Sequence, residues 1–289
     1  MNDGAFQCPA VMDEDILWAA RLVGLPETAF TGFDGKDPRG MIMKSMMPMD
    51  VAACPGSGKT TLLVAKLAIL ANKWRHRTRG ICILSHTNAA RREIESRLGN
   101  TAPGRRLLAY PHFVGTIHAF VNEFLAMPWL RSQGNAIKMV DDTSVEARRR
   151  RLLQRREFSA LRTYVAQKEA PTSTGFKKNL VGQWCIASPT FLVHDENGSP
   201  VFQNPGRSSA QLQRLAECVF SDGYHRHCEM FVWAGILLDK VPGVAQALRE
   251  RFSLLFMDEA QDNSESQAAI LHRIFMPEDG AVVRQRLVV

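Results

Sequence analysis

The chain has 289 residues, of which 45% are hydrophobic and 22% charged, and it carries a net charge of +7. This length supports one or two globular domains, and the basic excess suits an anionic partner, foremost nucleic acid, or is simply a basic surface. No apolar run is long enough to span a bilayer, no signal peptide is apparent, and the six cysteines lack a paired spacing. These features argue against a membrane protein or a disulfide scaffold, and we expect a cytoplasmic protein with no membrane partner.

The first half of the chain alternates helices and strands. Helical periodicity predicts four helices, over residues 15–25, 59–74, 88–98 and 119–127. Short apolar runs predict three strands, over residues 51–53, 81–84 and 113–117. Residues 26–40 predict a loop, and five methionines after it are expected to fill core space near a strand: Met41, Met43, Met46, Met47 and Met49. Such alternation favours an α/β fold with a parallel sheet.

The second half of the chain has a different character. Residues 143–168 are charged and helical, with arginines at positions 148–151, 155 and 156, and residues 183–208 predict a loop or a short hairpin. Three further helices are predicted, over residues 209–220, 229–238 and 265–275. Strands are predicted again over residues 252–257 and 281–289, so they return only after a mainly helical stretch.

A glycine-rich turn at residues 53–60 (Ala-Cys-Pro-Gly-Ser-Gly-Lys-Thr) lies between a predicted strand and a predicted helix, which is the setting of a P-loop. Its glycines allow backbone N–H groups to approach phosphate at the start of a helix. Lys59 would reach the β- and γ-phosphates, and the Thr60 hydroxyl would bind Mg²⁺. The pattern usually begins with Gly, where this chain has Ala53, but a stray surface turn would lack the flanking strand and helix. We therefore expect ATP and Mg²⁺ as cofactors, with the nucleotide bound by Ala53, Cys54, Pro55, Gly56, Ser57, Gly58, Lys59, Thr60 and Thr61.

A pair of carboxylates, Asp258 and Glu259, directly follows the apolar strand predicted at residues 252–257. Ligands bind at the carboxyl end of such strands, where Asp258 would hold Mg²⁺ and Glu259 would polarise the attacking water as general base. An acidic pair alone is common at helix starts, but one behind a buried strand and a P-loop indicates a Walker B motif. Lys59 and Asp258 are 258 − 59 = 199 positions apart, which predicts an insertion between the two motifs.

Four segments, in order, resemble motifs of the UvrD/Rep/PcrA-like superfamily 1A DNA helicases. Residues 53–60 are similar to motif I, and residues 258–262 (Asp-Glu-Ala-Gln-Asp) to motif II. Residues 84–94 (Leu-Ser-His-Thr-Asn-Ala-Ala-Arg-Arg-Glu-Ile) resemble motif Ia, and residues 115–120 (Gly-Thr-Ile-His-Ala-Phe) resemble motif Ib. Together the four motifs extend over most of the chain and are far more specific than any one of them.

The resemblance implies a fold and an activity. The fold would be α/β, a P-loop RecA-like parallel sheet flanked by helices (domain 1A, residues 1–128 and 246–289, cut short at its carboxyl end), with an inserted helical 1B-like subdomain over residues 129–245. In the complete protein, ATP hydrolysis would drive 3′-to-5′ translocation on single-stranded DNA. The catalytic residues would be Lys59, Asp258, Glu259 and Gln261, of which Gln261 senses the γ-phosphate. Residues along the DNA path would be Thr87, Asn88, Thr116 and His118, although Asn88 also suits a helix cap and His118 a polar core position.

Two departures from the family pattern bear on the activity. The glutamine that reads adenine upstream of motif I has no good counterpart, because Gln7 alone precedes the loop. Motifs III to VI, with their arginine fingers, are absent from these residues, and Arg284 and Arg286 do not replace them. An arginine finger contributes roughly 10³–10⁵ in rate. We therefore expect poor hydrolysis and no unwinding by the chain alone, with a partner protein supplying the second RecA-like lobe.

Other interpretations remain open from the sequence alone. The chain would act as a motor half on single-stranded DNA and single/double-strand junctions, or as a nucleotide-binding regulatory module without motor activity; a P-loop kinase or unrelated ATPase fits motifs Ia, Ib and II less well. The basic segment 73–79 and the arginines at 148–156 suit either phosphate contact or a solvated surface. The spacing of Cys218, His225, His227 and Cys228 fits no common zinc site.

Overall fold

The computed structural model describes residues 6–52, 54, 56–171, 178–276 and 286–288. The chain folds into two units: Met1–Phe120 together with Gly243–Val289 forms unit 1, and Val121–Pro242 forms unit 2. Within the described ranges no single helix is long and apolar enough to cross a bilayer, and α12 (His227–Lys240) and α13 (Gly243–Arg251) meet that test only as a bent, broken pair.

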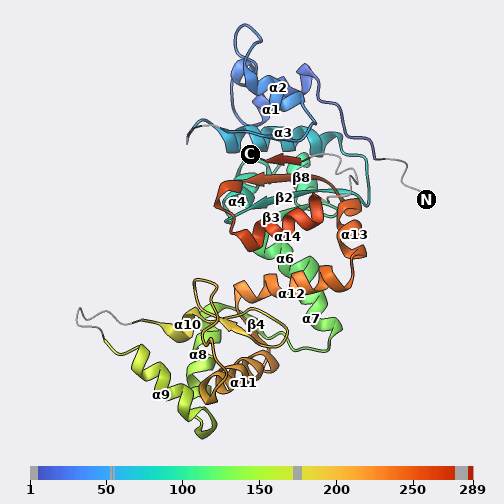
Figure 1. Ribbon diagram of the computed structural model, residues 1–289. Coiled ribbons are helices and arrows are strands. Elements are labelled where there is room, and N and C mark those ends of the chain that lie inside the picture. The colour runs from blue at the N-terminus through green and yellow to red at the C-terminus, as the bar shows by residue number, and fades with distance from the viewer. Residues whose placement is uncertain (1–5, 53, 55, 172–177, 277–285, 289) are drawn as a thin grey trace. The chain divides into compact units, whose positions relative to one another are not determined.

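Unit 1 is built around a parallel sheet of five strands (Figure 1). In chain order the strands are β1 (Met49–Asp50), β2 (Gly80–Ser85), β3 (Phe113–Thr116), β8 (Phe252–Asp258) and β9 (Arg286–Val288). Their order across the sheet is β1-β9-β8-β2-β3, and every pairing is parallel. The predicted α/β class with a parallel sheet is therefore confirmed. β2 and β8 are continuous apolar runs because helices cover both faces of the sheet.

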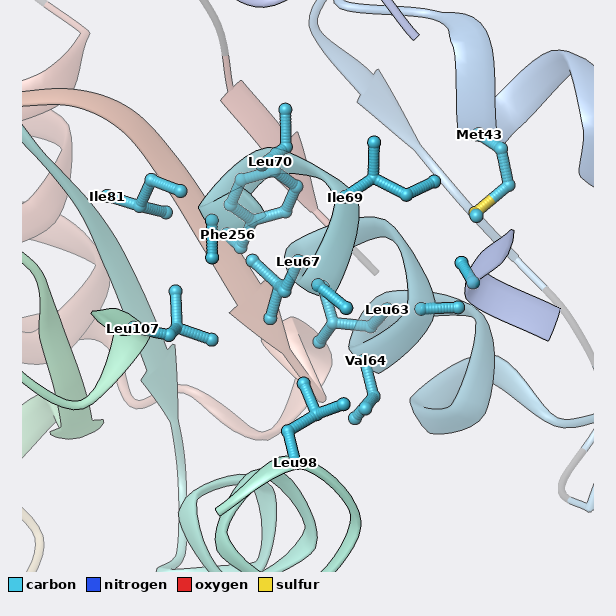
Figure 2. Close-up of a cluster of buried hydrophobic side chains, with 14 of the residues drawn as sticks. Met43, Leu63, Val64, Leu67, Ile69, Leu70, Ile81, Leu98, Leu107 and Phe256 are labelled. Carbon is cyan, nitrogen blue, oxygen red and sulfur yellow. The ribbon is translucent and has the colours of Figure 1, made fainter. Parts of the chain in front are cut away.

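One face of the sheet packs against α3 (Lys59–Lys73), beside which lie α1 (Asp13–Leu22), α4 (Ala89–Leu98) and α5 (Ala102–Leu107). Alternate residues of each strand point to this face, as Ile81 and Ile83 do from β2. Figure 2 shows Leu67 and Leu70 of α3 beside Phe256 of β8 in this core. Ten consecutive residues of α3, 62–71, are buried, so this helix is central to unit 1.

The opposite face of the sheet is covered by α6 (Ile117–Val121), α13 and α14 (Glu265–Phe275), and Figure 1 shows α3 and α14 on opposite sides of the sheet. An aromatic cluster joins these helices to the strands. The ring of Phe120 lies 5.7 Å from that of Phe113, 5.9 Å from that of Phe252 and 6.0 Å from that of Phe275. Such tilted and edge-on aromatic pairs add to the stability that burial alone provides.

The segment before β1 differs from the prediction. Residues 26–40 contain a 3₁₀ turn (Glu27–Phe30) and the start of α2 (Pro38–Lys44), which Asp37 caps with Pro38 at the first helical position. The helix separates the methionines: Met43 is fully buried, whereas Met41 is 76% exposed. Met47 is also exposed, so the expectation that the methionine cluster fills the core is wrong for these two. Residues two apart on a helix point to nearly opposite sides.

Unit 2 is mainly helical. Its helices are a π-helical turn (Asn122–Ala126), α7 (Met127–Ser132), α8 (Asp142–Leu153), a 3₁₀ turn (Arg156–Phe158), α9 (Ser159–Lys168), α10 (Leu180–Gln183), α11 (Arg207–Ser221) and α12. Two short pairs of strands complete it: β4 (Met139–Val140) with β7 (Tyr224–His225), and β5 (Cys185–Ile186) with β6 (Val193–His194). The second pair is antiparallel and forms the short hairpin expected in residues 183–208.

Unit 2 contains a buried ion pair between α8 and α12. Arg149 and Glu229 are 2% and 1% exposed, and the Arg149 Nη2 to Glu229 Oε1 distance is 2.9 Å. Arg149 also donates to the carbonyl of Trp184, and Glu229 accepts from the backbone N–H of Arg226. Neither interpretation of this arginine run, a solvated face or a phosphate contact, therefore holds for Arg149. Its two neighbours, Arg148 and Arg150, form ion pairs with carboxylates of the same unit.

One cysteine pair was not expected from the spacing. Cys185 of β5 and Cys228 of α12, 43 positions apart, form a disulfide within unit 2. The sequence around these two cysteines does not indicate that they pair, because only the fold brings β5 beside the start of α12. Cys228 is thereby engaged, and no cluster of three His, Cys, Asp or Glu side chains able to hold a metal occurs in the described part of the chain.

Candidate functional site

The glycine-rich turn lies between β1 and α3, at the carboxyl edge of the sheet. Gly56 and Gly58 have φ of 78° and 86°, a left-handed conformation that L side chains rarely adopt. The Ser57 N–H donates to the carbonyl of Cys54 over 3.1 Å, which closes the turn. Ala53 and Pro55, also expected at the nucleotide, lie outside the described residues.

The turn leads directly into the N-terminus of α3. Gly58 is the N-cap residue and has no side chain with which to cap the first N–H groups of the helix. Lys59, Thr60 and Thr61 in the first turn are half-buried, whereas Cys54 and Ser57 are exposed. Exposed N–H groups, the helix dipole and a lysine at one helix start together favour a bound phosphate.

Asp258 ends β8 on the face of the sheet that packs against α3. Leu254 and Phe256 belong to that core, and side chains alternate along a strand, so Asp258 points to the same face. Burial raises the pKa of the Asp258 carboxyl, and the nearby charge of Glu259 raises it further, while the Glu259 N–H and the charge of Lys59 oppose the shift. Asp258 and Lys59 are thus close enough for their charges to interact.

The Asp258 carboxylate has spare binding capacity. Asp258 is only 7% exposed. Its Oδ1 atom has no hydrogen-bond partner among the residues that the structure describes. A buried, unpartnered carboxylate oxygen costs free energy unless a cation or donor satisfies it. Oxygen is the ligand that Mg²⁺ prefers, so the donor set of Asp258 and the Thr60 hydroxyl fits this ion.

The residues after Asp258 form a tight turn. Glu259 adopts a left-handed backbone with φ of 53°, one of two non-glycine residues with positive φ in the described chain. A 3₁₀ turn (Ala260–Asp262) follows, and the exposed Gln261 side chain donates a hydrogen bond to the Glu259 carboxylate. Strained backbone of this kind is frequent where a side chain must be aimed at a ligand.

The residues expected along DNA lie at or just beyond the carboxyl ends of β2 and β3, at the same edge of the sheet. Thr87 and Asn88 are exposed and immediately precede α4. Asn88 occupies the N-cap position, but its side chain accepts no capping hydrogen bond from the described backbone of α4, so the expected side-chain cap is not observed. The Thr116 Oγ1 accepts from the Ala119 N–H over 3.1 Å at the start of α6, which contains the half-buried His118.

Strand register brings the ends of three strands together. Ser85 of β2 pairs with Asp258 of β8 on one side and with Thr116 of β3 on the other. The segments that resemble motifs Ia, Ib and II are therefore neighbours at one edge, although they are far apart in the sequence. Ser85 was not singled out from the sequence; its signal is a polar residue that ends a wholly buried strand.

Gln7 lies far from this edge. The neighbouring Phe6 ring packs 5.7 Å from that of Trp74, and the Gln7 carbonyl lies 3.4 Å from Nε2 of His76, just beyond the C-terminus of α3. α3 has 15 residues and rises about 1.5 Å per residue, so this end is roughly 22 Å from the glycine-rich turn. Gln7 is therefore not placed to read a base bound there, and the basic segment 73–79 lies at the same distant end.

Comparison with known proteins agrees with the resemblance of the motifs. A model of the UvrD/REP helicase N-terminal domain matches residues 36–283. The chain is 25% identical over 256 residues to an ATP-dependent DNA helicase PcrA of Leuconostoc citreum, a match that covers 85% of this chain and 31% of that protein. It is 36% identical over 95 residues to the Gabija protein GajB of Bacillus cereus strain VD045, covering 32% of this chain and 17% of that protein.

The matched region thus amounts to about a third or less of the length of these curated relatives. The family match includes both halves of the carboxyl-edge site, from the glycine-rich turn to the turn after β8. The chain belongs to the UvrD/REP helicase N-terminal domain family.

Proposed function

We propose that unit 1 is the RecA-like domain 1A of a UvrD-type DNA helicase and binds ATP with Mg²⁺ at the carboxyl edge of its sheet. The observation that carries the proposal is that Asp258 points to the sheet face covered by α3, the helix that begins at the glycine-rich turn. The strand order β1-β9-β8-β2-β3 supports the proposal. β1, which leads into the glycine-rich turn, and β8, which ends at Asp258, lie on either side of the parallel strand β9.

Each group at the edge has a chemical role in this proposal. The N–H groups from Gly56 to Lys59 hold the phosphates, and the Lys59 ammonium neutralises the β- and γ-phosphate charge. Thr60 and Asp258 would hold the magnesium ion, which supplies charge neutralisation on the phosphate oxygens when bound. Glu259 accepts a proton from the attacking water. Gln261, which is hydrogen-bonded to Glu259, would sense the γ-phosphate.

Unit 2 is proposed to be the inserted 1B-like subdomain. It lies between the two segments of unit 1 in the sequence and is mainly helical. Its interior contains the buried Arg149–Glu229 pair. Most of the arginines of α8 are satisfied internally, so a nucleic-acid surface in this unit would have to use other cations.

Single-stranded DNA is the proposed polymer substrate. Thr87, Asn88, Thr116 and His118 lie at the ends of two neighbouring strands at the edge that holds Asp258. DNA bound there would therefore lie at the same edge of the sheet as the nucleotide. ATP hydrolysis coupled to 3′-to-5′ translocation, and action at single/double-strand junctions, are proposed for the complete motor, in which a second RecA-like lobe closes on the nucleotide.

Binding and turnover together test the proposal. Affinity for a fluorescent ATP analogue is measured with Mg²⁺ and with EDTA, for the wild-type chain and for Lys59→Ala. ATP hydrolysis is then measured with and without oligo(dT). Magnesium-dependent binding that Lys59→Ala abolishes supports the nucleotide site, and stimulation by DNA supports a motor domain.

The alternative is a regulatory nucleotide-binding module. That function requires tight binding of nucleotide, no turnover and no response to DNA even when a second lobe is supplied. Absence of any magnesium-dependent binding contradicts both functions.

A further inference from the structure

Ser85 is the last residue of β2 and is only 4% exposed, at the end of an otherwise apolar strand. It lies in register between Asp258 of β8 and Thr116 of β3. Adjacent strands are about 4.8 Å apart, so a single residue separates the proposed magnesium ligand from the segment proposed to contact DNA. Ser85 faces α3, as Ile81 and Ile83 do, and therefore shares a face with Asp258.

The Ser85 hydroxyl also holds the loop that follows β2. Its Oγ donates a hydrogen bond to the carbonyl of Thr87, two residues further on. A serine hydroxyl has one proton, so this bond fixes the direction of the donor. Thr87 is exposed and Asn88 begins α4, so the bond ties an exposed loop to the strand beside Asp258.

We propose that Ser85 is a positioning residue that couples nucleotide binding at Asp258 to DNA binding at Thr87 and Asn88. The inference rests on the proposed function and identifies how its two sites communicate. A magnesium ion bound with the nucleotide would neutralise the carboxylate charge at the end of β8, and the backbone hydrogen bonds between β8 and β2 would transmit the resulting adjustment to Ser85. Because the Ser85 hydroxyl is bonded to the Thr87 carbonyl, a shift of Ser85 would also shift the loop that carries Thr87 and Asn88.

Thermodynamic linkage makes this role measurable without turnover. If nucleotide tightens DNA binding by some factor, DNA must tighten nucleotide binding by the same factor. A residue that merely supports the fold would change both separate affinities or the stability. A coupling residue changes the factor that relates the two affinities.

The experiment compares Ser85→Thr with Ser85→Val, two side chains of the same shape that differ in the hydroxyl. Affinity of the full chain for fluorescent oligo(dT) is measured with and without a non-hydrolysable ATP analogue and Mg²⁺, and affinity for the analogue with and without oligo(dT). Ser85→Val is expected to reduce the linkage factor about fivefold while each separate affinity changes less than about twofold. Ser85→Thr keeps the wild-type factor. The matched control, Ser253→Ala at the opposite end of β8, also keeps it.

The outcomes separate this inference from the proposed function. An equal linkage factor in Ser85→Thr and Ser85→Val overturns the role of Ser85, as does a wild-type chain that binds both ligands independently. A wild-type chain that fails to bind the analogue or oligo(dT) contradicts the proposed function itself, and the coupling role fails with it. Because the Thr and Val variants share any packing penalty, a general loss of stability affects both and leaves their difference interpretable.

Discussion

Arg149 and Glu229 are 80 positions apart in the sequence and form an ion pair that is almost completely buried in unit 2. Burying two charges is expensive, and their mutual attraction offsets the cost only while both are present. The pair also bonds to the backbone of the segment at β5: Arg149 donates to the Trp184 carbonyl, and Glu229 accepts from the Ile186 N–H. The pair therefore links α8, α12 and the segment at β5 within unit 2.

Glu229→Gln is expected to destabilise unit 2 by about 3–5 kcal/mol, because it leaves the Arg149 guanidinium buried without a counter-charge. Urea unfolding followed by tryptophan fluorescence measures the loss. Glu217→Gln is the matched control, since Glu217 pairs with Arg214 on the surface of α11, and it should leave the unfolding midpoint unchanged. Equal midpoints for both variants would show that the buried pair has no special importance.

Asp258→Asn is expected to raise the thermal midpoint of the nucleotide-free protein and to abolish magnesium-dependent nucleotide binding. Burial and the charge of Glu259 raise the pKa of Asp258, so the folded protein holds this proton more tightly than the unfolded chain does. Between the unfolded and folded pKa values, stability therefore falls as pH rises. The gain in Asp258→Asn should be full at neutral pH and vanish below the ordinary carboxyl pKa of 3.8. Scanning calorimetry at pH 7 and pH 3.5 checks this; a lower midpoint at pH 7 would contradict it.

Acid should destabilise unit 1 through His112. Burial lowers the pKa of this histidine from 6.5 to about 4, with a smaller effect from the charge of Arg106, and its Nδ1 accepts a hydrogen bond from the Ile81 N–H. The unfolded chain takes up a proton below pH 6.5 while the folded protein does not, so stability falls as pH drops from 6.5 to 4. We expect a loss of about 2 kcal/mol between pH 7 and pH 5.

The matched variant for this prediction is His112→Asn, which keeps an acceptor but does not titrate in this range. Urea unfolding of both proteins at pH 7 and pH 5 gives the comparison. The variant should lose markedly less stability than the wild type over this interval. A parallel decline of both proteins would assign the acid sensitivity to other groups.

Asn88→Ala distinguishes two roles for this residue. A side chain that caps α4 would contribute about 1 kcal/mol to stability, whereas the structure shows no such capping bond. We therefore expect an unchanged unfolding midpoint and about three- to tenfold weaker binding of oligo(dT), which corresponds to one lost hydrogen bond. Fluorescence anisotropy and urea unfolding on the same preparation measure both. A destabilised variant with normal DNA affinity would assign Asn88 to the fold alone.

Local patterns predicted the parallel sheet and the order of its motifs. The glycine-rich turn needs positive φ at two positions, and the apolar run before Asp258 needs burial on both faces, so both features are visible within a few residues. The predicted bounds of the helices over residues 59–73 and 265–275 are correct to within one residue at each end, because their periodicity is also a local pattern.

The rest depended on contacts between distant segments. Arg149 belongs to a run of four arginines, and only the position of Glu229 makes one of them buried. The Cys185–Cys228 bond and the remote place of Gln7 also follow from the folded arrangement. The position of Ser85 between Asp258 and Thr116 could not be predicted, because the sequence does not indicate that β2 lies between β3 and β8.

The position of β9 has a consequence for how the protein is made. β9 is the last described strand in the chain, yet it lies between β1 and β8, so the two strands that lead to the glycine-rich turn and to Asp258 do not touch each other. During synthesis on the ribosome, the two halves of the edge lack the strand that joins them until residues 286–288 have emerged. Nascent chains that end before β9 should therefore lack nucleotide affinity, and longer ones should acquire it, which makes this site among the last parts of unit 1 to assemble.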